Sequence, residues 1–205
     1  MPRGIANKEA AILGAAVRLF SRRHYYSVTV PEIAREAAVG EGTIYIYFKN
    51  KEDLAAAAFN SIQADLEREV ISFLPDQADS REQLNIVAAA LFARAADDPD
   101  AIGYGLLIRH RDFLPVDRIQ EGDHLTPLLR MLMVRGRRSQ AIRAAPIDVL
   151  CALWLGIVRA GLELHAGGTT LDPDQVGAMA WDAVAEPVDG AAGSWTVAAS
   201  GARAE

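Results

Sequence analysis

Apolar residues recur every three or four positions along almost the whole chain, whereas the two-residue alternation of a half-buried strand is nearly absent. This spacing is typical of amphipathic α-helices that bury one face. We therefore predict an all-α fold, in which Pro127 kinks or splits one of the helices. The expected helices cover residues 7–21, 29–36, 41–48, 51–73, 80–97, 100–111, 117–138, 147–166 and 173–186.

Two stretches have the sequence of a capping box, in which two side chains three positions apart bond to each other's backbone N–H groups. Thr29 and Glu32 form the first, with Pro31 inside the first turn. Ser80 and Gln83 form the second. Helices are therefore expected to begin at these two places.

The predicted helices divide the chain into two helical units and a tail. Residues 1–50 hold three helices that form a small bundle. The next helix, 51–73, would be about 34 Å long at 1.5 Å per residue, which is long enough to join this bundle to a larger body. The body covers residues 51–186, and the small and polar residues of 187–205 predict a disordered tail.

The predicted helix at 147–166 is apolar on nearly every side. Its polar residues Asp148, Arg159 and Glu163 fall near one line, together with small residues. One body cannot bury so broad an apolar surface, so a second subunit is the economical partner; the central helix of a monomeric bundle is the alternative. We expect a homodimer in which this helix and the last one form a four-helix interface. The residues expected there are Leu153, Ile157, Val176, Met179 and Trp181.

The net charge of −6 is unevenly distributed along the chain. Residues 1–53 carry eight Lys or Arg and six Asp or Glu, whereas residues 54–205 carry 13 and 21. A mildly basic N-terminal unit on an acidic body suits a protein that presents one end to phosphates.

Neither a membrane span nor a signal peptide is expected. The most apolar segment, 147–166, contains charged residues, and the N-terminus has no apolar run behind a basic start. The single cysteine, Cys151, has no intrachain partner, which fits a reducing compartment, and is expected to be a small buried side chain. We predict a cytoplasmic protein with no membrane partner.

Residues 8–54 carry an ordered set of motifs. An alanine-rich helix ending in Leu-Phe is followed by Thr-x-x-x-Ile-Ala and then by Gly-Thr-hydrophobic-Tyr-x-Tyr-Phe-x-x-Lys-x-x-Leu. This set resembles the TetR family of one-component transcriptional regulators. The resemblance implies a helix-turn-helix DNA-binding domain at 1–50 and a ligand-sensing and dimerisation domain at 51–186. It also implies a repressor that a small-molecule effector, of unspecified identity, releases from a palindromic operator in double-stranded DNA.

The resemblance places the DNA contacts on the second and third predicted helices. The third helix would enter the major groove, while its residues Ile44 and Phe48 face the core. In the homodimer, two such helices would enter grooves about 34–36 Å apart, one turn of DNA. The positions that correspond to DNA contacts in the family are Thr29, Val30, Glu41, Gly42, Thr43, Tyr45, Ile46, Tyr47 and Lys51.

Four positions depart from the family pattern. Ile46 stands where a polar or basic residue is usual, so its base contact would be apolar, for example to a thymine methyl. Glu41 could accept a hydrogen bond from cytosine or face solvent. His24 and Ala38 stand where glycine is usual; a positive φ at Ala38 would cost about 1 kcal/mol, unless Gly40 supplies the flexibility instead.

The resemblance further implies an effector pocket inside the body. Each candidate residue could instead be ordinary core packing. The neighbouring residues Arg109, His110 and Arg111 form a basic cluster that could accept an anionic group or face solvent. The pocket candidates are Phe59, Phe92, Tyr104, Leu107, Ile108, Phe113, Leu128, Met131, Leu132 and Trp154.

The main alternatives are an all-α enzyme and an interaction protein without DNA binding. The four histidines form no helical i, i+4 pair and have no Cys-x-x-Cys companion. A phosphate-binding glycine loop and a Gly-x-Ser-x-Gly nucleophile motif are also absent from the sequence. We therefore expect no catalytic residues, no metal site and no cofactor.

Overall fold

The computed structural model describes residues 3–75 and 77–186, with side chains described from residue 8 onward. Within these residues it contains ten α-helices and no β-strand, so the all-α prediction is confirmed. The helices are α1 (Arg3–Arg22), α2 (Val30–Glu36), α3 (Glu41–Tyr47), α4 (Lys51–Phe73), α5 (Ser80–Asp97), α6 (Pro99–Ile102), α7 (Val116–Gly122), α8 (Leu125–Arg138), α9 (Ile147–Ala166) and α10 (Pro173–Asp182).

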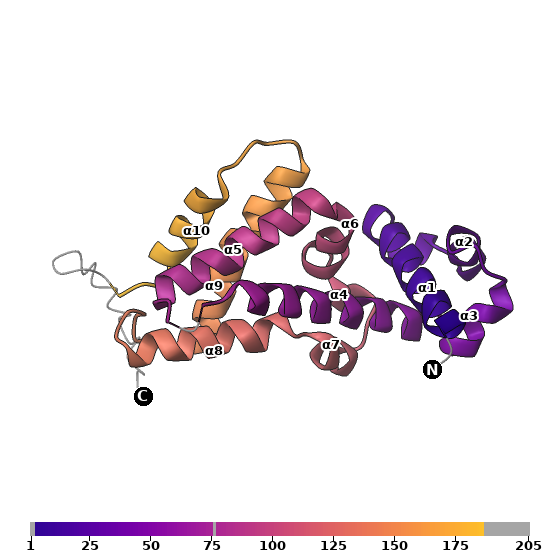
Figure 1. Cartoon of the computed structure of the whole chain (residues 1–205), viewed down its shortest axis with the longest axis horizontal. Coiled ribbons are helices and arrows are strands. Elements are labelled where there is room, and N and C mark those ends of the chain that lie inside the picture. The colour runs from indigo at the N-terminus through magenta and orange to yellow at the C-terminus, as the bar shows by residue number, and fades with distance from the viewer. Residues whose placement is uncertain (1–2, 76, 187–205) are drawn as a thin grey trace, which may run out of the picture.

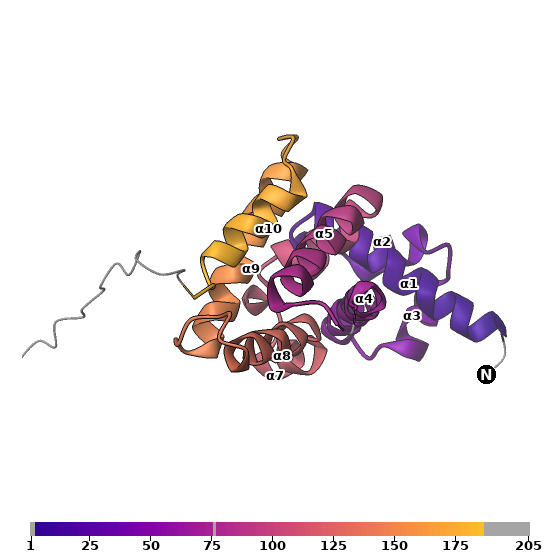
Figure 2. The ribbon, with the colours of Figure 1, turned by 60° about the vertical axis from the view of Figure 1, so that its left-hand side comes forward.

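The molecule is elongated, with α1–α3 at one end and α8–α10 at the other (Figure 1). Helix α4 runs lengthwise between them. Figure 2 views α4 nearly along its axis and shows α1, α5, α7 and α8 arranged around it. A displacement of α4 would therefore shift the helices packed against it at both ends of the molecule.

The N-terminal unit is built around a small core that joins α1, α2 and α3. Phe20, Ile33, Ile44 and Phe48 are all buried, in agreement with the apolar pattern. The capping box of α2 is present, with the backbone N–H of Thr29 donating to the Glu32 carboxylate over 2.8 Å. These contacts hold α3 on the outside of the unit with one face free.

The body packs closely around α4 where glycines face it. A Cβ atom added to Gly105 would lie 2.6 Å from Cγ2 of Ile62, inside contact distance. Gly105 belongs to a π-helical turn, η2 (Gly103–Leu107), and its carbonyl accepts a 2.8 Å hydrogen bond from Nε2 of Gln63 on α4. This close approach ties the middle of α4 to the segment that follows α6.

Several predicted helix boundaries differ from the structure, and α1 begins at Arg3, four residues before the predicted start. Segment 100–111 is not one helix, because α6 gives way to η2 and then to a 3₁₀ turn, η3 (His110–Asp112). The predicted bounds of α5, 80–97, are confirmed, but its N-cap is Asp79, whose carboxylate accepts from the N–H of Glu82, so the predicted capping box at Ser80 lies one residue too late.

The predicted end of α10 is also wrong. This helix ends at Asp182 and not at residue 186, where an isolated bridge joins Ala185 to Ile142. The break within 117–138 is confirmed, and it falls just before Leu125, which leaves Pro127 in the first turn of α8. The predicted disordered tail, 187–205, lies outside the described residues.

The connection between α2 and α3 keeps a strained residue. Ala38 has φ 53°, whereas Gly40 has φ −70°, so Gly40 does not relieve the strain. His24, the other departure from glycine, has an ordinary φ of −57°. The left-handed conformation is thus retained at Ala38 without the glycine that normally accommodates it.

Replacing Ala38 with glycine is expected to raise the free energy of unfolding by about 1 kcal/mol, because the left-handed region penalises a Cβ atom. Ala38 is exposed, so no packing is lost. Urea unfolding checks this, with Ala37→Gly as the matched control, since Ala37 has φ −80° and should lose stability instead. A less stable Ala38→Gly variant would contradict the strain argument.

Candidate functional site

The outer face of α3 is exposed and carries large side chains. Tyr45 is 51% exposed and Ile46 is 79% exposed, and Glu41 and Gly42 at the start of the helix also face solvent. Ile44 lies on the opposite face and is buried. An exposed isoleucine beside an exposed tyrosine has no role in the core, so this face is a candidate contact surface.

The flanking predicted DNA contacts are less accessible. Thr29 is exposed, but its hydroxyl donates to the Glu32 carboxylate over 2.8 Å. The side chain of Val30 is buried, so this residue can offer only its backbone to a phosphate. Thr43 and Tyr47 are half-buried.

Lys51, also predicted to touch a phosphate, holds the N-terminal unit against α4. Its ammonium donates to the carbonyl of Tyr25 in the 3₁₀ turn η1 (Tyr25–Ser27) and lies 4.0 Å from the centre of the Tyr25 ring. Desolvation by this packing lowers the pKa of Lys51. An ammonium group has three N–H donors, so a phosphate contact remains compatible with this position.

Polar contacts fasten the N-terminal unit to the body. Nε and Nη2 of Arg22 donate to the two carboxylate oxygens of Asp100 over 2.9 and 2.6 Å, and the Ser21 hydroxyl donates to the same carboxylate over 2.6 Å. The Tyr26 hydroxyl donates to the carbonyl of Asp112 over 3.0 Å. A bidentate pair of this kind fixes orientation as well as distance.

Aromatic rings form a continuous series across the same boundary. The His110 ring lies 4.2 Å from Phe59 and 5.5 Å from Phe113, measured between ring centres. Phe113 stacks on Tyr25 at 4.4 Å with an angle of 14° between the planes. Tyr25 in turn carries the Lys51 contact, so the series runs from the interior of the body to the first turn of α4.

A half-open cavity of about 790 Å³ lies at the body end of this series, between α4, the η2–η3 segment, α7, α8 and α9. Three of the ten pocket candidates, Phe59, Leu107 and Ile108, line it. Phe113 lines the adjoining hollow beside Tyr25. The other six do not line this cavity. Met131 is exposed, and the rest are buried in the core: Phe92, Tyr104, Leu128, Leu132 and Trp154.

Two buried polar residues that were not among the pocket candidates line the cavity. Gln63 is 2% exposed; besides its bond to Gly105, its Oε1 accepts from the N–H of Leu125 over 3.3 Å. His110 is 7% exposed, and its Nε2 has no hydrogen-bond partner. Gln63 could have been found from the sequence, because it is a polar residue among the apolar positions of the predicted helix 51–73. His110 was recognised only as part of a basic cluster.

The His110 ring is uncharged at neutral pH. Burial lowers its pKa to about 4, the nearby Arg159 guanidinium acts in the same direction, and a backbone hydrogen bond with Ile108 opposes them. Arg109 and Arg111, its neighbours in the basic cluster, are exposed on the rim.

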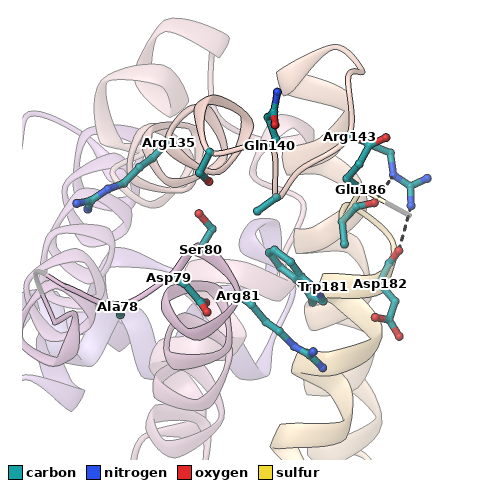
Figure 3. Close-up of a pocket in the computed structure, with 13 residues that line it drawn as sticks. Ala78, Asp79, Ser80, Arg81, Arg135, Gln140, Arg143, Trp181, Asp182 and Glu186 are labelled. Carbon is teal, nitrogen blue, oxygen red and sulfur yellow. Dashed lines mark hydrogen bonds between the residues drawn. The ribbon is translucent and has the colours of Figure 1, made fainter. Parts of the chain in front are cut away.

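Another hollow, of about 940 Å³, lies at the far end of the body, beyond the ends of α8 and α10 (Figure 3). Trp181 forms part of its wall, and Arg143 donates to the carbonyls of Asp182 and Ala185, over 3.1 Å in each case. It has no contact with the aromatic series, so an occupant would have no direct route to the N-terminal unit.

The predicted dimer interface is partly exposed. Leu153 on α9 is 47% exposed and Met179 on α10 is 63% exposed, while Ile157 is half-buried. Val176 and Trp181 are instead buried within the chain, because α10 packs this face against α5 and α9. These two side chains therefore belong to the core of the chain.

No helix among the described residues has both the length and the apolarity needed to cross a membrane. Nor do those residues bring three or more His, Cys, Asp or Glu side chains together as metal ligands. Cys151 is buried and unpaired, as expected of a small core side chain, and burial raises the pKa of its thiol.

Comparison with known proteins agrees with this geometry. Residues 12–58 match the model of the bacterial regulatory proteins of the tetR family. The fatty acid metabolism regulator protein of Bacillus subtilis is 33% identical over 91 residues, which cover 44% of this chain and 47% of that protein. The chain thus matches about half the length of this relative, which is named as a regulator and not as an enzyme.

Two solved structures share the fold over nearly the whole chain. A TetR family transcription regulator from Marinobacter aquaeolei VT8 has a TM-score of 0.80 at 23% identity and covers 91% of this chain and 100% of its own. The FadR regulator of Bacillus subtilis in complex with stearoyl-CoA has a TM-score of 0.69 at 22% identity, with 84% and 95% covered.

Helix α3 follows α2 after a short turn and exposes its outer face, and the rest of the chain is helical. This arrangement defines a helix-turn-helix protein. The matched family model assigns residues 12–58 to the tetR family of bacterial regulatory proteins, and the two solved structures share the fold of nearly the whole chain.

Proposed function

We propose that the chain is a DNA-binding transcriptional regulator that acts as a homodimeric repressor in the cytoplasm and leaves a palindromic operator when a small molecule binds its body. The observation that carries this proposal is the free outer face of α3, where Tyr45 and Ile46 project from a helix held rigidly by its buried side. Tyrosine hydroxyls suit phosphates, and an isoleucine suits a thymine methyl.

The DNA-binding part is tested by the mobility of DNA. The wild-type chain should retard a fragment of the intergenic DNA beside its own gene and leave an unrelated fragment of equal length free at the same salt concentration. An all-α enzyme or an interaction protein without DNA binding would retard neither fragment.

The dimer is supported by the exposed apolar residues of α9 and α10. Helices α9 and α10 pack side by side, so Leu153 and Met179 can lie on one surface. Two copies related by a twofold axis would cover this surface with four helices and place two α3 helices for successive major grooves.

Replacing Leu153 and Met179 together with glutamate is expected to convert the dimer to monomers at micromolar concentration, because charges would have to be buried at the interface. Sedimentation velocity checks this. The control is Ile71→Glu, which places a charge at a 50% exposed apolar position on α4. A wild-type chain that sediments only as a monomer would refute the dimer.

The response to a small molecule is supported by the cavity and by its connection to α4. Gln63 links α4 to both η2 and the start of α8, and the aromatic series links the cavity wall to Tyr25 and Lys51. An occupant that separates these elements would tilt α4 and change the spacing of the two α3 helices. The complex of FadR with stearoyl-CoA supports a ligand-responsive body of this fold.

A further inference from the structure

His110 has the one buried side-chain polar atom that lines the cavity and lacks a hydrogen-bond partner, among the described residues. The residue is 7% exposed, and its Nε2 is enclosed. An unsatisfied buried acceptor or donor costs free energy, so a ligand that reaches this atom when the cavity wall adjusts would gain a hydrogen bond.

The tautomer of His110 determines what Nε2 can bind. The backbone hydrogen bond with Ile108 raises the imidazole pKa, as a carbonyl that accepts from the ring does. Nε2 has no partner, so the nitrogen that donates to Ile108 is Nδ1. A neutral imidazole carries one N–H, and Nε2 is therefore left with a lone pair. The ligand atom that meets it must be a hydrogen-bond donor.

The rest of the cavity argues against a strongly charged ligand. Its lining is mixed, and the apolar side chains Phe59, Leu106, Leu129 and Leu155 line it together with His110. The cations on its rim are balanced by acids, as where Arg159 lies near Asp123 and Glu163. No excess of positive charge is available to offset the desolvation of an anion.

We propose that the effector is an uncharged, largely apolar molecule bearing a hydroxyl group, a phenol or an alcohol, whose O–H donates to Nε2 of His110. This inference rests on the proposed function, since it identifies the ligand class of the same regulator. The apolar part would lie against Phe59, Leu129 and Leu155, and the hydroxyl would satisfy the buried nitrogen.

The test compares hydroxyl compounds with methyl ethers that keep the oxygen but cannot donate. The pairs are 2-naphthol with 2-methoxynaphthalene, 4-phenylphenol with 4-methoxybiphenyl, and 1-decanol with 1-methoxydecane. Binding to the full chain is measured by calorimetry without DNA. In at least one pair the hydroxyl compound should bind ten-fold or more tightly than its ether. Equal affinities in every pair, or no binding by any hydroxyl compound, would overturn the proposal.

Two variants locate the preference. His110→Phe keeps a ring of similar size and should bind a hydroxyl compound and its ether equally; a retained preference would overturn the role of His110. Gly156→Leu is the second variant, because a Cβ at Gly156 meets no atom within 4 Å and the new side chain would occupy the cavity wall. It should weaken binding of both members of a pair. Undiminished binding would place the ligand elsewhere, whether or not His110→Phe folds.

Failure of this inference is separable from failure of the proposed function. A chain that retards its upstream DNA but shows no hydroxyl preference remains a regulator with another effector class. A chain that binds the hydroxyl compounds but no DNA keeps this site and loses the regulatory role.

Discussion

Replacing Tyr45 and Ile46 together with alanine is expected to lower the affinity for the operator by roughly 100-fold or more, since a good base contact contributes about 1–3 kcal/mol and the loss of a phosphate contact adds to this. The two side chains are 51% and 79% exposed and have no role in the core, so the fold should be unchanged. Fluorescence anisotropy with the upstream fragment and with an unrelated fragment measures both affinity and specificity.

A control substitution at a distant exposed residue shows whether the loss of DNA affinity is specific to α3. Ile71→Ala removes an exposed isoleucine near the far end of α4 and should leave the affinity within a factor of about two. Operator affinity equal to that of the wild-type chain in the Tyr45 and Ile46 double variant would show that α3 does not read DNA.

Replacing Phe113 with alanine is expected to disconnect the cavity from the DNA-binding unit. The Phe113 ring lies between His110 and Tyr25, so its removal eliminates both ring contacts and interrupts the aromatic series. Coupling between two sites is reciprocal, so DNA bound at α3 must change the ligand affinity of the cavity by the same factor as a ligand changes the DNA affinity. The DNA can therefore serve as the probe for this connection.

Hydrogen exchange measured by mass spectrometry follows this coupling. In the wild-type chain, the upstream fragment should change amide exchange in η3 about five-fold or more, in line with typical coupling energies. In Phe113→Ala that change should fall below two-fold while DNA still binds. Phe73→Ala, at an exposed phenylalanine on α4, is the control. An unchanged response in Phe113→Ala would exclude the aromatic series as the connection.

The helices were predictable where strong local signals mark their ends. Helices α4 and α9 have the predicted bounds, because a proline follows one and a pair of glycines follows the other. The segment after α6 was not predictable, because its π-helical turn depends on the tertiary contacts of Gly105 with Ile62 and Gln63. Helical periodicity carries no information about such contacts.

The two parts of the candidate site differ in the same way. The helical spacing of residues in α3 was enough to predict that Ile44 faces the core and that Tyr45 and Ile46 face outward, because a short helix has one buried face and one free face. In the body, Trp154 and Phe59 both point inward, and the pattern cannot tell that one packs in the core and the other lines a cavity. His110 was obscured for another reason: it lies between two exposed arginines in a turn, where sequence favours a solvated cluster.

The central claim is that two α3 helices of a homodimer read one symmetric DNA site. Hydroxyl-radical footprinting of the wild-type chain on its upstream fragment tests it most directly. We predict two protected segments related by a dyad, with centres about one helical turn, roughly 10 base pairs, or a multiple of it apart. A single asymmetric segment, or uniform weak protection of the whole fragment, would contradict it.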